Sequence, residues 1–297
     1  MTPMLIADFD RLVEAPDALM QLRRLLLNLA IRGKLLAQDD GDEPAQDLLQ
    51  RVAQRRLELL DGQTPRRGRR SAPVAAVDDE PFVLPKTWAW TTLGQIGLVS
   101  PRNELDDDAE AGFVPMTLIP VEYGRAATHE VRPWKEIKKG YTHFADGDLG
   151  LAKITPCYEN GKSTVFRDLP GGMGAGTTEL HIVRPLLVNA EYLLLVLKSS
   201  YFVGTGIPKM TGTAGQKRVP SDYFAGAPIP LPPLDEQQRI VDKIQELLVL
   251  CEELQTSTAH AAQLRSRLFE AVVSRALADD IVGPEDLDAG DGPSDAP

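Results

Sequence analysis

Apolar residues recur at helical intervals near both ends of the chain, whereas in the middle they form short, interrupted runs. Residues 18–37 are rich in Leu and contain no Pro, which predicts a helix, and Gly33 favours a C-terminal break near its end. Pro44 suits the first turn of a second helix that continues to about Leu60.

The middle segment, residues 85–233, alternates short apolar runs with clusters of Gly, Pro and Asn, which is typical of short β-strands. The apolar stretch 190–202 predicts a helix among them. The glycine-rich stretch 171–176 lacks the Lys-Ser/Thr ending of a phosphate-binding P-loop, and we interpret it as a loop. We expect a mixed, strand-rich domain.

A long helical pattern follows the Pro-rich stretch 227–234, with Asp235 predicted as the N-cap. Eight of ten positions at alternating spacings of four and three are apolar or Cys, which is a heptad seam; the ten are Ile240, Ile244, Leu247, Cys251, Leu254, Thr258, Ala261, Arg265, Leu268 and Val272. Such a helix is about 60 Å long. It requires a partner helix, either from the N-terminal part of this chain or from a second copy.

These patterns predict an α+β fold, in which a strand-rich mixed domain is flanked by an N-terminal helical segment and a long C-terminal coiled-coil helix. The expected boundaries are 1–60 for the N-terminal helical segment, 61–84 for a linker, 85–233 for the mixed domain, 234–278 for the spacer and dimerisation helix, and 279–297 for an acidic disordered tail.

The net charge of −11 is unevenly distributed along the 297 residues. Residues 85–233 carry 15 basic and 15 acidic side chains, whereas residues 234–297 carry 5 basic and 14 acidic. Seven of those acids lie in the last 19 residues, which contain no Lys or Arg. Because net charge says little about a local site, the acidity does not exclude nucleic-acid binding by the middle domain.

Composition and motifs argue against a membrane protein, a secreted protein, a metalloprotein and an enzyme. No apolar run approaches the roughly 18–20 residues that span a bilayer, and the N-terminus lacks the features of a secretory signal. Cys157 and Cys251 form neither a disulfide framework nor a metal-binding spacing, so we expect a cytoplasmic protein that uses no membrane and no metal. The sequence has no Cys–His spacing typical of a nucleophilic enzyme, and it lacks the Asn/Asp-Pro-Pro-aromatic motif of methyltransferases. It therefore gives no support to an enzyme.

Three parts of the sequence resemble the specificity (S) subunit of type I restriction–modification systems. The most specific string is Pro-Leu-Pro-Pro-Leu-x-Glu-Gln-x-Arg-Ile-Val, between a strand-rich domain and a long helix. The segments are Gly147–Lys162 with Gly176–Pro185, Gly212–Pro220 with Ile229–Val241, and Leu25–Leu36 with Asp42–Ala45.

The resemblance implies a non-catalytic subunit whose target recognition domain reads one half of a split site in double-stranded DNA. Its helices would dock modification methyltransferase subunits that use S-adenosylmethionine, so this chain would bind no cofactor. Whether a restriction endonuclease subunit joins is left open. Most family members carry two recognition domains, whereas this chain shows one. Either two copies pair head to tail as a homodimer, which predicts a symmetric interrupted site, or the protein reads a single half-site.

Two segments carry side chains suited to DNA, because Lys and Arg bind phosphates while forked or amide side chains read base edges. In the first, the candidates are Lys153, Tyr158, Asn160 and Lys162, and the alternative is a tight turn with exposed lysines. In the second, the alternative is a flexible basic loop, and the candidates are Lys209, Thr211, Thr213, Gln216, Lys217 and Arg218.

The heptad seam supplies the predicted dimer or subunit interface, which consists of Ile240, Ile244, Leu247, Leu254 and Leu268. A competing hypothesis is a coiled-coil assembly or regulatory protein that keeps this fold without reading DNA. The acidic tail and the electrically neutral middle domain motivate that alternative.

Overall fold

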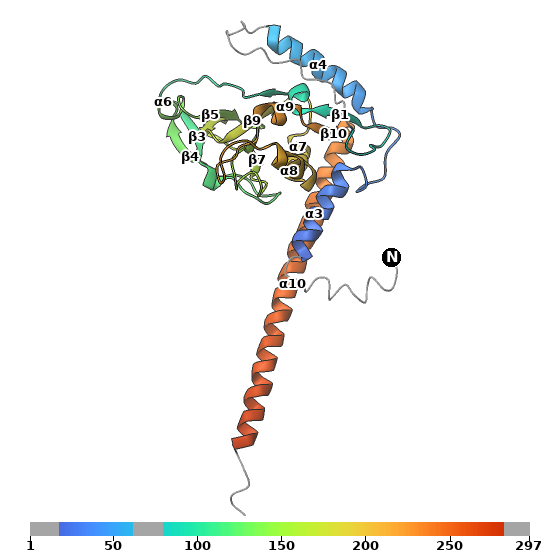
Figure 1. The fold of residues 1–297 in the computed structure, drawn as a ribbon, viewed down its shortest axis with the longest axis vertical. Coiled ribbons are helices and arrows are strands. Elements are labelled where there is room, and N and C mark those ends of the chain that lie inside the picture. The colour runs from blue at the N-terminus through green and yellow to red at the C-terminus, as the bar shows by residue number, and fades with distance from the viewer. Residues whose placement is uncertain (1–17, 62–79, 282–297) are drawn as a thin grey trace, which may run out of the picture. The chain divides into compact units, whose positions relative to one another are not determined.

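The computed structural model describes residues 18–61 and 80–281. Most of the predicted linker (62–79) and the predicted acidic tail from residue 282 lie outside these ranges. Within the described residues, two helices precede a mixed domain and one long helix follows it, so the predicted α+β fold is confirmed (Figure 1).

The first helix, α3 (Ala18–Ile31), ends earlier than the predicted 18–37 because its C-terminus is closed by a glycine turn. Gly33 has a φ of +63°. The amides of Gly33 and Lys34 donate to the carbonyls of Ala30 and Leu29 respectively, which is a Schellman motif. The second helix, α4 (Ala45–Asp61), begins directly after the proline that predicted it.

The described strands form three sheets. The first is an antiparallel pair, β1 (Ala89–Thr92) with β10 (Pro228–Leu231). The second sheet is antiparallel throughout, in the order β2 (Gly97–Val99), β9 (Leu180–Pro185), β6 (Leu149–Ala152) and β7 (Ser163–Val165). The third has one parallel pair, β3 with β8, in the order β4 (Glu130–Pro133), β3 (Glu110–Val114), β8 (Met173–Gly176) and β5 (Thr142–Ala145).

Strand β8 shows that the interpretation of residues 171–176 as a loop was wrong for Met173–Gly176. A Cβ atom on Gly174 would lie 2.4 Å from the carbonyl oxygen of Gly112 and 2.7 Å from the ring of Phe144. The glycines are therefore there because an inner strand is packed too closely for side chains.

The stretch predicted as one helix at 190–202 forms two, α7 (Ala190–Lys198) and α8 (Ser200–Gly206). Ser199 separates them, and its Oγ accepts from the amide of Phe202 as the N-cap of α8. Residues 192–197 of α7 are all buried in the main core. The short helices are α5 (Leu93–Ile96), η1 (Met116–Leu118), α6 (Trp134–Ile137), η2 (Pro170–Gly172), η3 (Ile207–Lys209) and α9 (Ser221–Gly226).

The long helix α10 runs from Leu234 to Ile281. The prediction that Asp235 is its N-cap was wrong, because Asp235 lies within the first helical turn. None of the described helices combines the length and apolar composition needed to cross a membrane.

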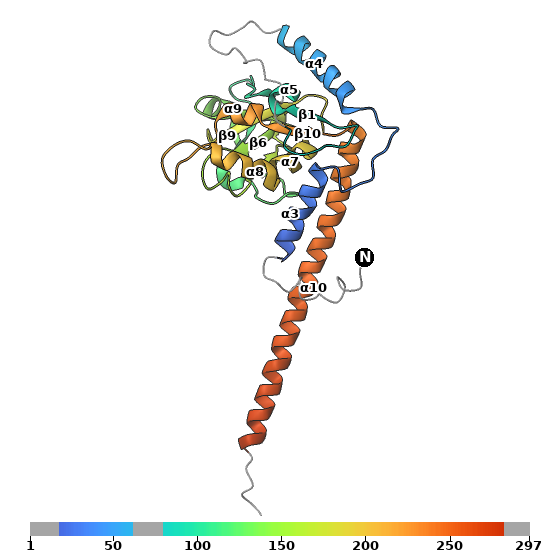
Figure 2. The same ribbon diagram turned by 45° about the vertical axis from the view of Figure 1, so that its right-hand side comes forward.

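The first turns of α10 are packed within this chain, with α3 beside them in both views (Figures 1 and 2). Ile240 and Ile244 are at most 1% exposed and belong to the same core cluster as Leu27 and Ile31 of α3. The prediction that Ile240 and Ile244 contact another chain was therefore wrong, since their side chains are already covered.

Beyond Leu248, α10 belongs to a separate compact unit. Leu254 is half-buried, whereas Leu268 is 66% exposed. The predicted interface set thus divides: its first two members are core residues, Leu247 and Leu254 are half-buried, and Leu268 remains available to a partner.

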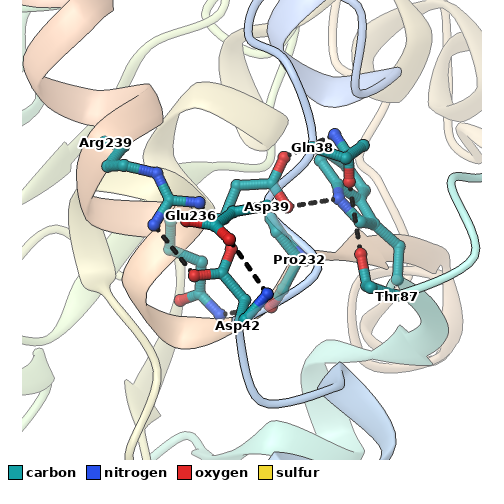
Figure 3. A network of polar contacts seen from close by, with 10 residues as sticks. Gln38, Asp39, Asp42, Thr87, Pro232, Glu236 and Arg239 are labelled. Atoms are coloured by element: carbon teal, nitrogen blue, oxygen red, sulfur yellow. Dashed lines mark hydrogen bonds and ion pairs between the residues drawn. The ribbon is translucent and has the colours of Figure 1, made fainter.

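A buried polar network joins the start of α10 to the loop after α3 and to the mixed domain (Figure 3). Glu236 is 1% exposed, and its carboxylate accepts hydrogen bonds from Nε1 of Trp88 and Nε2 of Gln38, each at 2.8 Å. Arg239 donates through both terminal nitrogens to the carboxylate of Asp42.

The neighbouring glutamine extends this network into the mixed domain. The fully buried Gln237 donates from Nε2 to the carbonyl of Pro232 and accepts from the amide of Asn189, each at 2.9 Å. The Glu-Gln-x-Arg part of the most specific string in the sequence therefore makes structural contacts at this junction.

We predict that Glu236→Ala destabilises the protein by about 1–3 kcal/mol, because it leaves the buried indole donor of Trp88 without its acceptor and removes the hydrogen bond from Gln38. Glu236→Gln retains one acceptor oxygen and is expected to cost less. Urea titration followed by tryptophan fluorescence measures the difference. Glu253→Ala, which removes an exposed carboxylate from the same helix, is the control, and equal midpoints for all three variants would contradict the role of this network.

Candidate nucleic-acid interface

The two segments predicted to contact DNA lie side by side in the fold. The amide and the hydroxyl of Thr155 both donate to the carbonyl of Lys217, each at 3.0 Å. The amide of Val219 donates to the carbonyl of Lys153 at 2.8 Å. Sequence reasoning identified the segments separately, and the backbone hydrogen bonds bring them into one surface.

The second segment is a hairpin, which we call the Thr211–Arg218 hairpin. The amides of Thr211 and Arg218 each donate to the other residue's carbonyl, at 3.0 and 2.8 Å. Gly212 and Gly215 have φ values of +123° and +76°, which residues with a side chain rarely adopt. The residues with exposed side chains in and beside it are Lys209, Thr211, Thr213, Gln216 and Lys217.

Arg218 is held by an acidic residue that the sequence analysis missed. Its Nε donates to Oε2 of Glu179 at 2.9 Å and its Nη2 donates to Oε1 at 2.8 Å. The hydrogen bond from Arg218 lowers the pKa of the Glu179 carboxyl, and the charge of Lys153 lowers it further. Glu179 lies 39 positions before Arg218, and no local pattern links the two.

In the first segment, the prediction that Tyr158 contacts DNA was wrong. Its side chain is fully buried, and its hydroxyl donates to the carbonyl of Phe202 at 3.0 Å. Asn160 is exposed, in a tight turn whose next residue, Gly161, has a φ of +71°. The tight turn that was the alternative interpretation of this segment is therefore present. Asn160 remains a predicted DNA contact.

The two lysines of the first segment are both half-buried. Nζ of Lys162 donates to the carbonyl of Met116 at 3.0 Å, so this side chain already supports the loop after β3. The backbone amide of Lys153 donates to the carbonyl of Glu179, which places Lys153 beside the Arg218–Glu179 pair.

A third lysine, Lys198 at the end of α7, supports the same region from inside. Its Nζ donates to the carbonyls of Pro120, Val121 and Gly161 at 3.2, 2.8 and 3.1 Å. One ammonium group thus fastens the turn of the first segment to the loop after β3. Burial lowers the pKa of Lys198 to about 7, against the opposing charges of Glu122 and Glu191.

No family model matches the chain. The specificity subunits of the type I restriction enzymes EcoEI and EcoAI, both from Escherichia coli, are each 44% identical to it, over 261 and 256 residues. These matches cover 86% and 85% of this chain but 43% of each relative, so the chain spans less than half the length of these proteins.

A solved structure on the complex assembly and conformational transition of the type I R-M system contains a chain of similar fold. The TM-score is 0.53 at 24% identity, over 71% of this chain and 54% of that chain. The 44% identity to two type I specificity subunits over most of this chain confirms the resemblance that the sequence motifs indicated, and the structural match shows a similar fold.

We predict that Lys198 titrates with a midpoint near pH 7 in the folded protein. Because this pKa lies below the usual lysine value of 10.5, the folded protein holds the proton less tightly than the unfolded chain. The contribution of Lys198 to the free energy of unfolding should therefore rise with pH between about 7 and about 10.5. NMR spectra of protein labelled with ¹³C at lysine Cε measure the midpoint. Lys198→Arg removes the resonance and so assigns it, and a midpoint near 10.5 would contradict the prediction.

Proposed function

We propose that this chain, which is similar to type I specificity subunits along most of its length, is the DNA sequence-specificity subunit of a type I-like restriction–modification complex. It reads one half of a bipartite site in double-stranded DNA. It catalyses no reaction and binds no cofactor itself, and it docks methyltransferase subunits that use S-adenosylmethionine. A restriction endonuclease subunit joins the same assembly when the complex cuts DNA.

The observation that carries this proposal is the convergence of the two candidate segments on one surface. The Thr211–Arg218 hairpin presents Lys217 and Gln216 to solvent, and backbone hydrogen bonds place Lys153 beside it. Cationic side chains suit phosphates, and amide side chains suit base edges. The domain's neutral net charge does not oppose this role, since the attraction is local.

The far part of α10 supports pairing with a second copy. Apolar side chains there are about half or more exposed, which is unusual for a helix without a partner; they are Leu264, Leu268, Phe269, Val272 and Leu277. A second copy presents the same apolar surface, so the contact is self-complementary. Two copies would bring two recognition domains and would read a symmetric, interrupted site.

We predict that Lys217→Ala weakens binding of the methyltransferase complex to its site by about tenfold, which corresponds to about 1.4 kcal/mol. Because the lost contact is to a phosphate, the slope of log affinity against log salt concentration should fall by about one, with the preferred sequence unchanged. Fluorescence anisotropy over a salt series measures both, and Lys139→Ala, an exposed lysine in another part of the domain, is the control.

The site for that measurement comes from methylation-aware sequencing of host DNA with and without the protein. A methylated motif that depends on the protein is expected. If none appears while the chain still assembles with helical partners, the regulatory coiled-coil hypothesis replaces DNA reading.

We predict that Leu268→Glu raises the dissociation constant of the homodimer at least tenfold, because it places a charge in an apolar contact. Light scattering across a concentration series measures the molar mass. Ser266→Glu adds the same charge at another exposed position of this helix and is the control. A wild-type protein that stays monomeric at micromolar concentration would overturn the pairing.

A further inference from the structure

The guanidinium of Arg218 is only partly used by the protein. It has five N–H donors. Nε and Nη2 donate to the carboxylate of Glu179, and Nη1 donates to the carbonyl of Gln216 at 3.0 Å. One N–H on each terminal nitrogen therefore has no acceptor among the residues that the structure describes, and the side chain remains 42% exposed.

These contacts hold the guanidinium in place. The backbone of Arg218 is paired with Thr211 across the hairpin and with Ile154 of the first segment. The backbone of Glu179 is also held, because its carbonyl accepts a hydrogen bond from the amide of Lys153. The side chain consequently loses little conformational freedom when it binds a ligand, in contrast to the exposed Lys209 and Lys217.

The charge of the pair distinguishes a base from a phosphate as the ligand. Glu179 neutralises Arg218 at hydrogen-bonding distance, which weakens the attraction of the guanidinium for the DNA backbone. The hydrogen-bonding capacity of the two remaining N–H groups is unchanged. A neutral, oriented pair of donors therefore suits a base edge better than a phosphate, for which the unpaired charge of a lysine is better suited.

Only one base offers two acceptors side by side in the major groove. Guanine presents N7 and O6, which a pair of donors on one guanidinium can contact together. Adenine places an amino donor beside its N7, cytosine presents an amino donor, and thymine has a single oxygen beside a methyl group. A pair of N–H donors on one guanidinium is therefore selective for guanine.

We propose that Arg218 reads a guanine in the half-site through its two terminal N–H groups, and that Glu179 is the positioning residue that orients it. This inference rests on the proposed function, and it adds one base of the target and one residue that sequence motifs did not indicate.

The first test compares the methylated motifs made by complexes that carry different variants. Arg218→Lys removes the paired donors and keeps the charge, so the motif should relax at one G·C pair, with discrimination there falling on the order of tenfold to a hundredfold. Lys217→Ala should leave the motif unchanged. Glu179→Gln should relax the same position to a smaller extent.

Glu179→Gln also separates orientation from a general structural role. Removing the carboxylate exposes the charge of Arg218, so binding to non-specific DNA should become tighter and more salt-dependent while discrimination at the guanine falls. A variant that only damages the fold would weaken both kinds of binding.

The second test uses wild-type protein, so it does not depend on a variant that folds. Each guanine of the half-site is replaced in turn by 7-deazaguanine, which lacks the N7 acceptor. One position should lose affinity about tenfold or more with the wild-type complex, a loss comparable to that of one bidentate base contact, and the same replacement should have little effect with Arg218→Lys.

A motif that Arg218→Lys leaves unchanged, with affinity reduced equally for all sequences, would overturn the proposal and make Arg218 a phosphate contact. A half-site without guanine, or no position at which the effect of 7-deazaguanine depends on Arg218, would overturn it as well. Absence of any protein-dependent motif with wild-type protein would instead count against the proposed function.

Discussion

The buried carboxylate of Glu236 constrains how the mixed domain and the helices beside it are arranged. A charge with 1% exposure is tolerated only where donors replace water, and its two donors come from segments 148 and 198 positions earlier in the chain. Trp88 precedes β1, and Gln38 follows α3. The start of α10, the loop after α3 and the beginning of the mixed domain must therefore meet at one point for this charge to be satisfied.

The helix α7 connects that junction to the candidate DNA surface. At its N-terminus, Asn189 contacts Gln237 and Gln238 of α10. At its C-terminus, Lys198 fastens the Gly161 turn and the loop after β3. Because the residues between these ends are buried in the core, the first turn of α10 and the first candidate segment are held by opposite ends of one short helix.

On the candidate surface, unpaired positive charge and a charge matched by an acidic partner lie on different residues. Lys209 and Lys217 are exposed, whereas the charge of Arg218 is matched by Glu179. Phosphate contacts position a protein on DNA, and base contacts select the sequence. The same hairpin can therefore perform both tasks with neighbouring residues, because the acidic partner changes what an arginine is suited to contact.

Local chemistry determined much of this structure from the sequence: the glycine that closes α3, the proline before α4, the α+β order of elements, and the two segments that form the candidate surface. Tertiary packing decided the features that no local sequence pattern indicates. Residues 173–176 form an inner strand, in which the close approach of Gly112 and Phe144 leaves no room for a side chain at Gly174. Tyr158 is a core residue, and its hydroxyl donates to a carbonyl 44 positions away. One heptad seam became buried at Ile240 and exposed at Leu268, since periodicity marks an apolar face without saying what covers it. Glu179 and Arg218 were joined in the same way, because an ion pair depends on distance in space and leaves no spacing in the sequence.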